Sequence, residues 1–299
     1  FGEALGNTLH RRLVEVYKGS SLQTWRNVVR VVPVNDFRQR ELVVLGGYGP
    51  LDTVLEGGAY QPLTTPSDAE NVYTPSKKGG IETITFETFK NDDISVLPSI
   101  PERMARAAAL TLHRFVFISL ISDNPTVVDV DGSMALFHSS RSNTTAVALS
   151  HAGYQSLKQK MRDQVNPGVS TDPLGLIPRY LLVPNELEDL AFQLTASDRA
   201  IPATTPGATD VPNIIRRDGV QPIVIDHWTD ANDWVLVANP ADTDTIEIGF
   251  LDGREDPELL MQDDPRSGAV FSSDEVTWKI RHIYGGQVAN FRAFQRGTQ

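Results

Sequence analysis

Residues 99–122 read SIPERMARAAALTLHRFVFISLIS, and this stretch predicts the longest helix of the chain. Ser99 and Glu102 stand at the spacing of a capping box, with Pro101 in the first turn, where a missing N–H costs little. One side of the helix would carry the apolar stripe Met104, Ala108, Thr111, Phe115 and Ile118. At 1.5 Å per residue such a helix is about 35 Å long, so it could serve as a structural spine.

The chain before this helix predicts a long β-excursion that packs poorly on itself. A short amphipathic helix over 4–17 comes first, and β-branched runs follow at 27–34, 41–45, 70–74 and 81–89. Glycine and proline separate these runs, as in Gly46-Gly47-Tyr48-Gly49-Pro50. Large apolar residues are too few to bury the backbone, so we expect a loop that becomes ordered against a neighbouring subunit.

The chain after the helix predicts an α/β region. Helices are expected at 151–165 and from Asn185, which has Glu188 three residues later. Strands are expected at 180–183, 222–226, 234–238 and 246–251, with a loop rich in proline, threonine and glycine at 200–213. The final runs, 276–284 and 288–295, alternate in period two around Gly285-Gly286, which predicts a terminal hairpin.

Composition limits the classes of protein to which the chain could belong. Its 299 residues carry a formal net charge of −11 and no cysteine, which excludes disulfides and suits assembly in a reducing cytoplasm. No block of lysine and arginine is long enough for sequence-specific DNA binding. The apolar run 115–121 is too short to cross a bilayer, so no membrane partner is expected. A chain that begins at Phe1 indicates processing or a cloning boundary, and we favour processing.

Motifs for catalysis and for cofactors are missing or incomplete. There is no Gly-x-Ser-x-Gly elbow, phosphate-binding loop or His-Glu-x-x-His pair, and the six histidines lack metal-ligand spacing. The segment 46–49 matches only part of a dinucleotide-binding turn, and Asp129-x-Asp131-Gly132 matches only part of a calcium-binding loop. In both places a plain turn is the favoured interpretation. The acidic stretch 252–264 favours a solvated loop over paired catalytic carboxylates. We therefore expect no cofactor, no metal and no enzymatic activity.

Several stretches, in order along most of the chain, resemble one protein family. They are Asn91-Asp92-Asp93 with 99–112, Asp131-Gly132 with 135–138, PRYLLVP at 178–184, IEIGFLDG at 246–253, and VTWKIRH at 276–282 with Tyr284-Gly285 and Arg292. These stretches resemble the major head subunit, or major capsid protein, of Mu-like tailed phages, close to those encoded as fusions with a prohead protease. The chain departs from the family where Arg141-Ser142 precede Asn143, because a second histidine often stands there.

The resemblance implies an α+β protein with the Hong Kong 97-type capsid fold. Residues 1–40 would form the N-terminal arm, and 41–83 the extended β-loop that reaches over a neighbour. Residues 84–125 and 272–299 would form the peripheral domain with the long spine helix, and 126–271 the axial α/β domain. Relatives lose an N-terminal segment during maturation, which would account for Phe1.

The same resemblance implies that the chain is a structural protein and not an enzyme. Its copies would self-assemble into hexamers and pentamers of an icosahedral phage head that encloses double-stranded DNA without sequence-specific binding. A portal and decoration or scaffolding proteins would be further partners, and the virion, assembled in the bacterial host cytoplasm, would be its location. An encapsulin-like nanocompartment shell is the alternative, and a soluble hydrolase or binding module is a more distant one.

Four basic residues are candidates for contacts between subunits. Lys77 and Lys78 lie on the expected extended loop, where some capsids of this fold crosslink a lysine to a neighbour's asparagine; solvated lysines or lysines beside acidic partners are favoured here. Arg281 and Arg292 stand in apolar strands, where an unpaired charge is costly. We therefore expect both arginines to be ion-paired within or between subunits.

Overall fold

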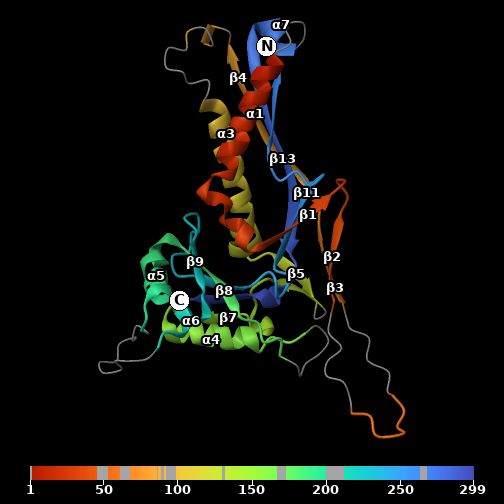
Figure 1. Cartoon of the computed structure of the whole chain (residues 1–299), viewed down its shortest axis with the longest axis vertical. Helices are drawn as coiled ribbons and strands as arrows, with labels where there is room; N and C mark the ends of the chain where they lie inside the picture. Colours follow the sequence, from red (N-terminus) through yellow and green to blue (C-terminus); the bar gives the residue numbers. More distant parts are fainter. Residues whose placement is uncertain are drawn as a thin grey trace.

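The computed structural model describes residues 2–45, 53–60, 68–85, 87–88, 91, 99–129, 132–166, 173–199, 212–262 and 268–299. The molecule is elongated, with a long upper part, a more compact lower part and a narrow hairpin beside them (Figure 1). Some features named above lie outside the described residues: the glycine-rich segment 46–50, Asp131, most of the loop 200–213, and Asp263 with Asp264.

Two helices run side by side along the upper part (Figure 1). They are α1, Gly2–Lys18, and α3, Ser99–Arg114, and α3 continues directly into the π-helical segment η2, Phe115–Ser122. Leu13 and Tyr17 of α1 pack against Ala105 and Ala109 of α3, and all four are fully buried. The helices predicted at 4–17 and 99–122 are therefore confirmed.

The buried side of α3 is not the predicted stripe. Ala105, Ala109 and Leu112 are fully buried, whereas Thr111 is exposed and donates its hydroxyl to the Ala107 carbonyl oxygen at 2.7 Å. The predicted stripe is thus displaced by about one residue. The physical reason is that two small alanines let α1 approach closely, and alanine contributes little to a hydrophobic pattern.

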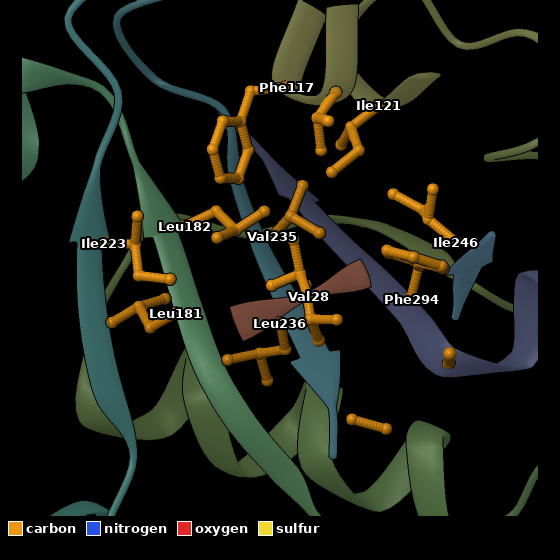
Figure 2. Packing of buried hydrophobic residues seen from close by; sticks show 14 of the residues in the cluster. Val28, Phe117, Ile121, Leu181, Leu182, Ile223, Val235, Leu236, Ile246 and Phe294 are labelled. Carbon is orange, nitrogen blue, oxygen red and sulfur yellow. The ribbon is translucent and has the colours of Figure 1, made fainter. Parts of the chain in front are cut away.

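The combined helix Ser99–Ser122 is long and apolar enough to cross a membrane by length and composition alone. In this fold its second half lies in the main core instead, where Val116, Phe117, Leu120 and Ile121 are buried. Phe117 and Ile121 face the strands of the lower part in Figure 2. The helix is therefore the core helix of a packed domain.

The upper part is built on a five-stranded sheet, here called the spine sheet. Its members are β1, Val29–Val34; β11, Ile246–Leu251; β13, Glu275–Val288; β12, Glu258–Gln262; and β4, Ser76–Thr85. The order is β1-β11-β13-β12, and β4 pairs along the other edge of β13. β1 is parallel to β11, and the remaining pairs are antiparallel.

The predicted terminal hairpin is wrong, because β13 runs straight through Gly285 and Gly286. A Cβ at Gly285 would lie 2.7 Å from the Thr74 carbonyl oxygen and 2.9 Å from the Cα of Pro75. The glycine pair therefore permits a second stretch of backbone to cross the strand, which is a recognised use of glycine inside strands. The last strand, β14, Phe294–Thr298, pairs with strands of the lower part and not with β13.

The lower part contains a second five-stranded sheet with the order β7-β14-β10-β8-β9. Its other strands are β7, Thr144–Ala146; β10, Trp234–Ala238; β8, Pro178–Val183; and β9, Gln221–Val224. Helices α4, His151–Arg162, α5, Glu188–Ala196, and α6, Ile214–Asp218, accompany it. α5 begins three residues later than predicted, after a short turn at Asn185–Leu187.

One hydrophobic core joins the two parts. It contains Val28, Ile246 and Phe294 together with residues from both faces of the second sheet. Leu182 and Val235 lie on the face toward Phe117 and Ile121, whereas Leu181 and Leu236 lie on the opposite face (Figure 2). At about 25 cal/mol per Å² of apolar surface, this shared burial is the main force that keeps the two parts together. The relative placement of the sheets is therefore fixed by packing.

The chain ranges predicted for the peripheral and axial domains each contribute to both sheets. β11 and β12 come from 126–271 but pair in the spine sheet, and β14 comes from 272–299 but pairs in the second sheet.

The remaining elements are short: β2, Arg40–Leu45; β3, Asp68–Tyr73; β5, Thr126–Asp129; β6, Gly132–Ala135; α7, Gly268–Ser273; and the 3-10 helices Ser21–Asn27, Ser139–Arg141 and Phe291–Ala293.

Candidate functional site

The hairpin of β2 and β3 stands apart from both sheets (Figure 1). Its strands pair only with each other among the described residues, with Arg40 opposite Tyr73 and Leu42 opposite Asn71. Farther along the same excursion, Leu55 is 79% exposed and Tyr60 is 87% exposed. Large apolar side chains left in water on a projecting segment are candidates for contact with another chain.

Lys77 and Lys78 begin β4, opposite Ile283 and His282 of β13. Both side chains are exposed, and the Lys77 Nζ lies 5.5 Å from the centre of the Phe37 ring. The two lysines border a groove of about 560 Å³ between β4 and α3, whose lining includes Met104, Ala107, Ala108, Thr111 and Ile280. The groove therefore combines an apolar lining with two lysines and one acidic residue, Glu82.

Arg281 lies in β13 and is paired with Glu258 of β12. Its Nε donates to Oε2 of Glu258 at 3.0 Å, its Nη2 donates to the same oxygen, and Arg254 binds the other carboxylate oxygen at 2.9 Å. Burial alone would raise the pKa of Glu258, but the hydrogen bonds from Arg281 and Arg254 outweigh burial and lower that pKa. The Arg281 side chain is 43% exposed, so it is also accessible to a second chain.

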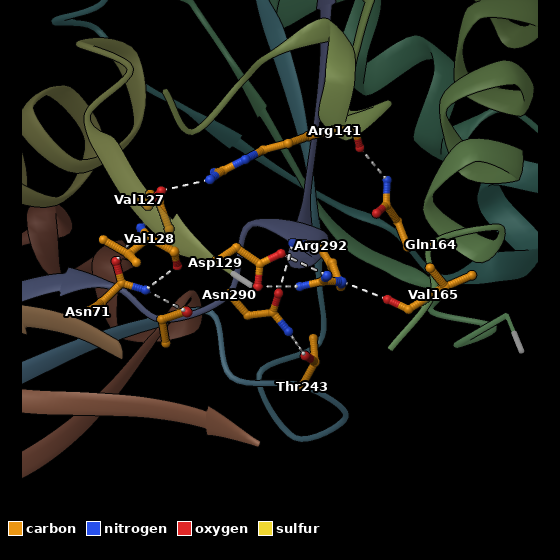
Figure 3. Close-up of polar contacts among 11 residues, drawn as sticks. Asn71, Val127, Val128, Asp129, Arg141, Gln164, Val165, Thr243, Asn290 and Arg292 are labelled. Carbon is orange, nitrogen blue, oxygen red and sulfur yellow. Dashed lines mark hydrogen bonds and ion pairs between the residues drawn. The ribbon is translucent and has the colours of Figure 1, made fainter. Parts of the chain in front are cut away.

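Arg292 lies in the 3-10 turn Phe291–Ala293 and not in a strand, as the sequence predicted, and it is enclosed by its own chain. Its Nη1 and Nη2 donate to the two carboxylate oxygens of Asp129 at 3.2 and 2.9 Å, and its Nε donates to the Val165 carbonyl oxygen at 2.6 Å (Figure 3). The side chains of Arg292 and Asp129 are only 5% and 4% exposed. Both arginines singled out in the sequence are therefore ion-paired, each with a carboxylate of the same chain.

The acidic stretch around 252–258 is bound to the N-terminal segment. Glu255 pairs with Arg26, and Asp256 pairs with Lys18 at 2.9 Å. The pattern predicted a solvated loop, and these partners were missed because Arg26 is 229 residues from Glu255 in sequence. The acidic residues therefore serve to attach α1 and the turn after it to the spine sheet.

The histidines do not form a metal site in the part of the chain that the structure describes, where no group of three His, Asp or Glu side chains could hold an ion. His113 and His227 have ring centroids 6.1 Å apart. Burial, and next the nearby His227, lower the pKa of His113 to about 4. His282 is also buried, against Phe250 and Tyr284, and burial lowers its pKa to about 4.

Two buried polar residues at the base of the hairpin had no signal in the sequence. Glu247 of β11 accepts hydrogen bonds from Arg40 and Tyr73, and Asn71 of β3 binds the backbone of Val128. These partners are between 57 and 207 residues apart, so no local pattern could have indicated them.

Comparison with known proteins identifies the family. The family model for phage capsid protein matches residues 69–297, which is more than half of the chain. No curated protein matches the sequence.

Solved structures with a similar fold come from several phages and from a GTA particle. A chain of Mycobacterium phage Adephagia matches with a TM-score of 0.60 and 13% identity, over 94% of this chain and 90% of that one. The capsid of a native GTA particle matches with a TM-score of 0.61 and 14% identity, over 93% and 90%. A chain of Microbacterium phage Oxtober96 matches with a TM-score of 0.58 and 13% identity, over 94% and 91%. At these identities the likeness concerns the fold, which is the capsid type expected from the sequence.

Proposed function

Because this chain belongs to the phage capsid protein family, we propose that its copies assemble into hexamers and pentamers of an icosahedral phage head that encloses double-stranded DNA. As a member of that family it is a structural component of the virion capsid, and its function is assembly and not catalysis. The observation that carries the proposal is the projecting hairpin excursion, which leaves Leu55 and Tyr60 in water unless another chain covers them.

Within the shell, the excursion 41–83 is proposed to reach over a neighbouring subunit, with 1–40 as an arm. The groove beside Lys77 and Lys78 is a suitable receiving surface, because the segment 53–60 carries the acidic residue Glu56 together with its exposed apolar residues. Acidic and apolar groups on one chain would meet basic and apolar groups on the next, which favours correct pairing over other arrangements.

The two arginines would take different parts in such contacts. Arg281 is accessible beside Arg254 and Glu258, so it could pair with a neighbour's carboxylate as well as its own. Arg292 is enclosed, and it would support the contact surface by holding Asp129 and Val165 in place. Portal and decoration or scaffolding proteins are proposed as further partners, with assembly in the cytoplasm of the bacterial host.

The acidic balance of the chain agrees with a container for DNA. A formal charge of −11 per subunit would keep packaged DNA mobile, because like charges repel and counterions balance both polymers. No sequence-specific DNA contact is proposed.

The proposal is tested by negative-stain microscopy together with size-exclusion light scattering on the purified chain, across salt and protein concentrations. Closed shells, or hexamers and pentamers that convert to shells, are the expected result. A monomer or small oligomer under every condition would contradict the proposal. Replacing Leu55 and Tyr60 by serine should abolish shells without unfolding the chain, whereas Ile177→Ser, an exposed apolar residue elsewhere, serves as the matched control.

A further inference from the structure

The direction in which the hairpin of β2 and β3 points is not set by any β-ladder. Among the described residues its two strands pair only with each other, and a two-stranded ribbon is at best marginally stable by itself in water. Something other than backbone pairing must therefore hold the hairpin at a fixed angle to the rest of the molecule.

A first anchor is the carboxylate of Glu247, which projects from β11 of the spine sheet. One of its oxygens, Oε1, accepts from the Arg40 Nε at 2.8 Å and from the Tyr73 hydroxyl at 3.0 Å. Arg40 and Tyr73 are opposite each other in the hairpin, one on each strand. A single buried oxygen thus binds both strands at the same rung.

A second anchor is the side chain of Asn71, which is almost fully buried. Its Nδ2 donates to the Val128 carbonyl oxygen at 3.0 Å, and its Oδ1 accepts from the Val128 N–H at 2.7 Å (Figure 3). The amide therefore pairs with β5 as a backbone rung would. The next residue, Asp129, is the one that binds Arg292, and through it Val165 of the lower part.

The β3 residues that take part in the two anchors, Asn71 and Tyr73, are two residues apart and so lie on the same face of the strand. At about 3.3 Å per residue they are separated by roughly 7 Å along the strand, and two separated points are enough to define a direction. Glu247 ties the hairpin to the spine sheet, and Asn71 ties it to the junction with the lower part. The opposite face carries Glu41, Val43, Glu70 and Val72, all exposed.

We infer that Glu247 and Asn71 are positioning residues for assembly: they fix the angle of the hairpin, and so the place at which its outer part meets a neighbouring subunit. This inference rests on the proposed function. A hairpin without these anchors would present its apolar residues at variable positions. Shells built from such subunits would be irregular in size or would fail to close.

The angle can be measured on the unassembled chain by spin labelling, because the native sequence has no cysteine to interfere. One label is placed at Val43→Cys on the exposed face of β2. The second is placed at Ala107→Cys on α3 or at Gln159→Cys on α4, both exposed. Double electron–electron resonance then gives the distribution of label-to-label distances. A single narrow peak is expected for both pairs in the otherwise native chain.

The double variant Glu247→Ala with Asn71→Ala should lose the narrow peak in both pairs, whereas Glu41→Ala with Glu70→Ala, on the exposed face of the same hairpin, should keep it. Glu247→Gln retains an acceptor oxygen, so its distance distribution should remain narrow. Tyr73→Phe removes one hydrogen bond without opening a cavity, so it supplies a milder variant if the double variant fails to fold by circular dichroism. It should broaden the peak for the α3 pair.

Assembly supplies the second readout. If the native chain forms uniform shells and the folded anchor variants form irregular ones, the inference is supported. Narrow distances in the anchor variants, or uniform shells from them, would overturn it while leaving the proposed function intact. Failure of the native chain itself to assemble would count against the proposed function, and the distance distributions would still decide whether the anchors fix the hairpin.

Discussion

Arg292 and Asp129 bind each other through two parallel hydrogen bonds, at 3.2 and 2.9 Å, in a position almost closed to solvent. Removing one member of a buried pair leaves an uncompensated charge in the interior. We therefore expect Asp129→Ala to lower the free energy of unfolding by about 3 to 5 kcal/mol, measured by urea denaturation. A loss below about 1 kcal/mol would show that water reaches the Arg292 guanidinium.

Arg281 offers the matched comparison, because its pair with Glu258 is partly exposed. Solvent and salt screen such a pair, so Arg281→Ala should lower the free energy of unfolding by no more than about 1 kcal/mol. High salt should make the small loss for Arg281→Ala smaller still and leave the loss for Asp129→Ala almost unchanged, since the buried pair is poorly screened. Equal losses for Arg281→Ala and Asp129→Ala would contradict the assignment of one pair to the surface and one to the interior.

The buried histidines predict sensitivity to acid. The pKa of His113 and that of His282 are each lowered to about 4, in both cases chiefly by burial, from an ordinary value near 6.5. Between those values the unfolded chain binds more protons than the folded one, so the free energy of unfolding falls as the pH is lowered. The expected loss is at most about 3 kcal/mol per histidine.

The measurement is the free energy of unfolding between pH 6.5 and 5, above the range in which most carboxylates titrate. His113→Phe removes one of the two groups and should make that dependence shallower, whatever its effect on stability at neutral pH. The exposed His138, replaced in the same way, is the control. An unchanged slope in His113→Phe would mean that His113 takes up its proton equally in the folded and the unfolded chain.

Gly285 and Gly80 predict opposite responses to the same substitution. A Cβ at Gly285 would collide with the backbone of Thr74 and Pro75, whereas nothing lies within 4 Å of a Cβ at Gly80. Gly285→Ala should therefore lower stability by about 1 to 3 kcal/mol through overpacking. Gly80→Ala, on the neighbouring strand, should change stability by no more than about 0.5 kcal/mol. Thermal unfolding of the two variants side by side decides the matter.

Lys77 and Lys78 lead to a prediction about assembled shells. Both lysines are exposed, so we expect them to bind acidic groups of a neighbour without forming a covalent bond. Shells boiled in detergent should then run as a single band near 32.9 kDa on a denaturing gel. Replacing both lysines by alanine should raise the protein concentration needed for assembly. A ladder of bands at multiples of the chain mass would instead indicate covalent crosslinks between subunits.

Much of the fold could be predicted from the sequence because its helices and most of its strands carry strong local patterns. Two of the errors among the strands come from glycine pairs. Gly285-Gly286 predicted a turn, and the run predicted at 81–89 began only after Gly79-Gly80, yet both pairs lie inside long strands, β13 and β4. In both places a glycine is needed where another backbone passes close by: Thr74 beside Gly285, and the Ile280 carbonyl oxygen, with which a Cβ at Gly79 would collide. A glycine pair is compatible both with a turn and with a strand that another backbone approaches closely, so the local sequence does not distinguish the two.

The candidate site could be predicted only in part. The sequence indicates which segment projects, because the number of apolar residues is a local property. It cannot indicate that Glu247 and Asn71 hold that segment, because each of these residues is recognised only by partners that folding brings together. The same holds for Lys18 and Arg26, whose acidic partners belong to the far end of the chain.

The passage from α-helix to π-helix at Phe115 lets one helix serve two cores. In the π-helical segment hydrogen bonds reach back five residues, as from the Asp123 N–H to the Ile118 carbonyl oxygen at 2.8 Å, so each turn holds more residues. The rotation between successive side chains is smaller there, and the apolar direction drifts around the axis. Ala105 and Ala109 can then face α1 while Phe117 and Ile121 face the sheet below (Figure 2). Deleting one residue within 115–122 would rotate the side chains after the deletion about the helix axis, so the helix could no longer direct both apolar faces to their partners.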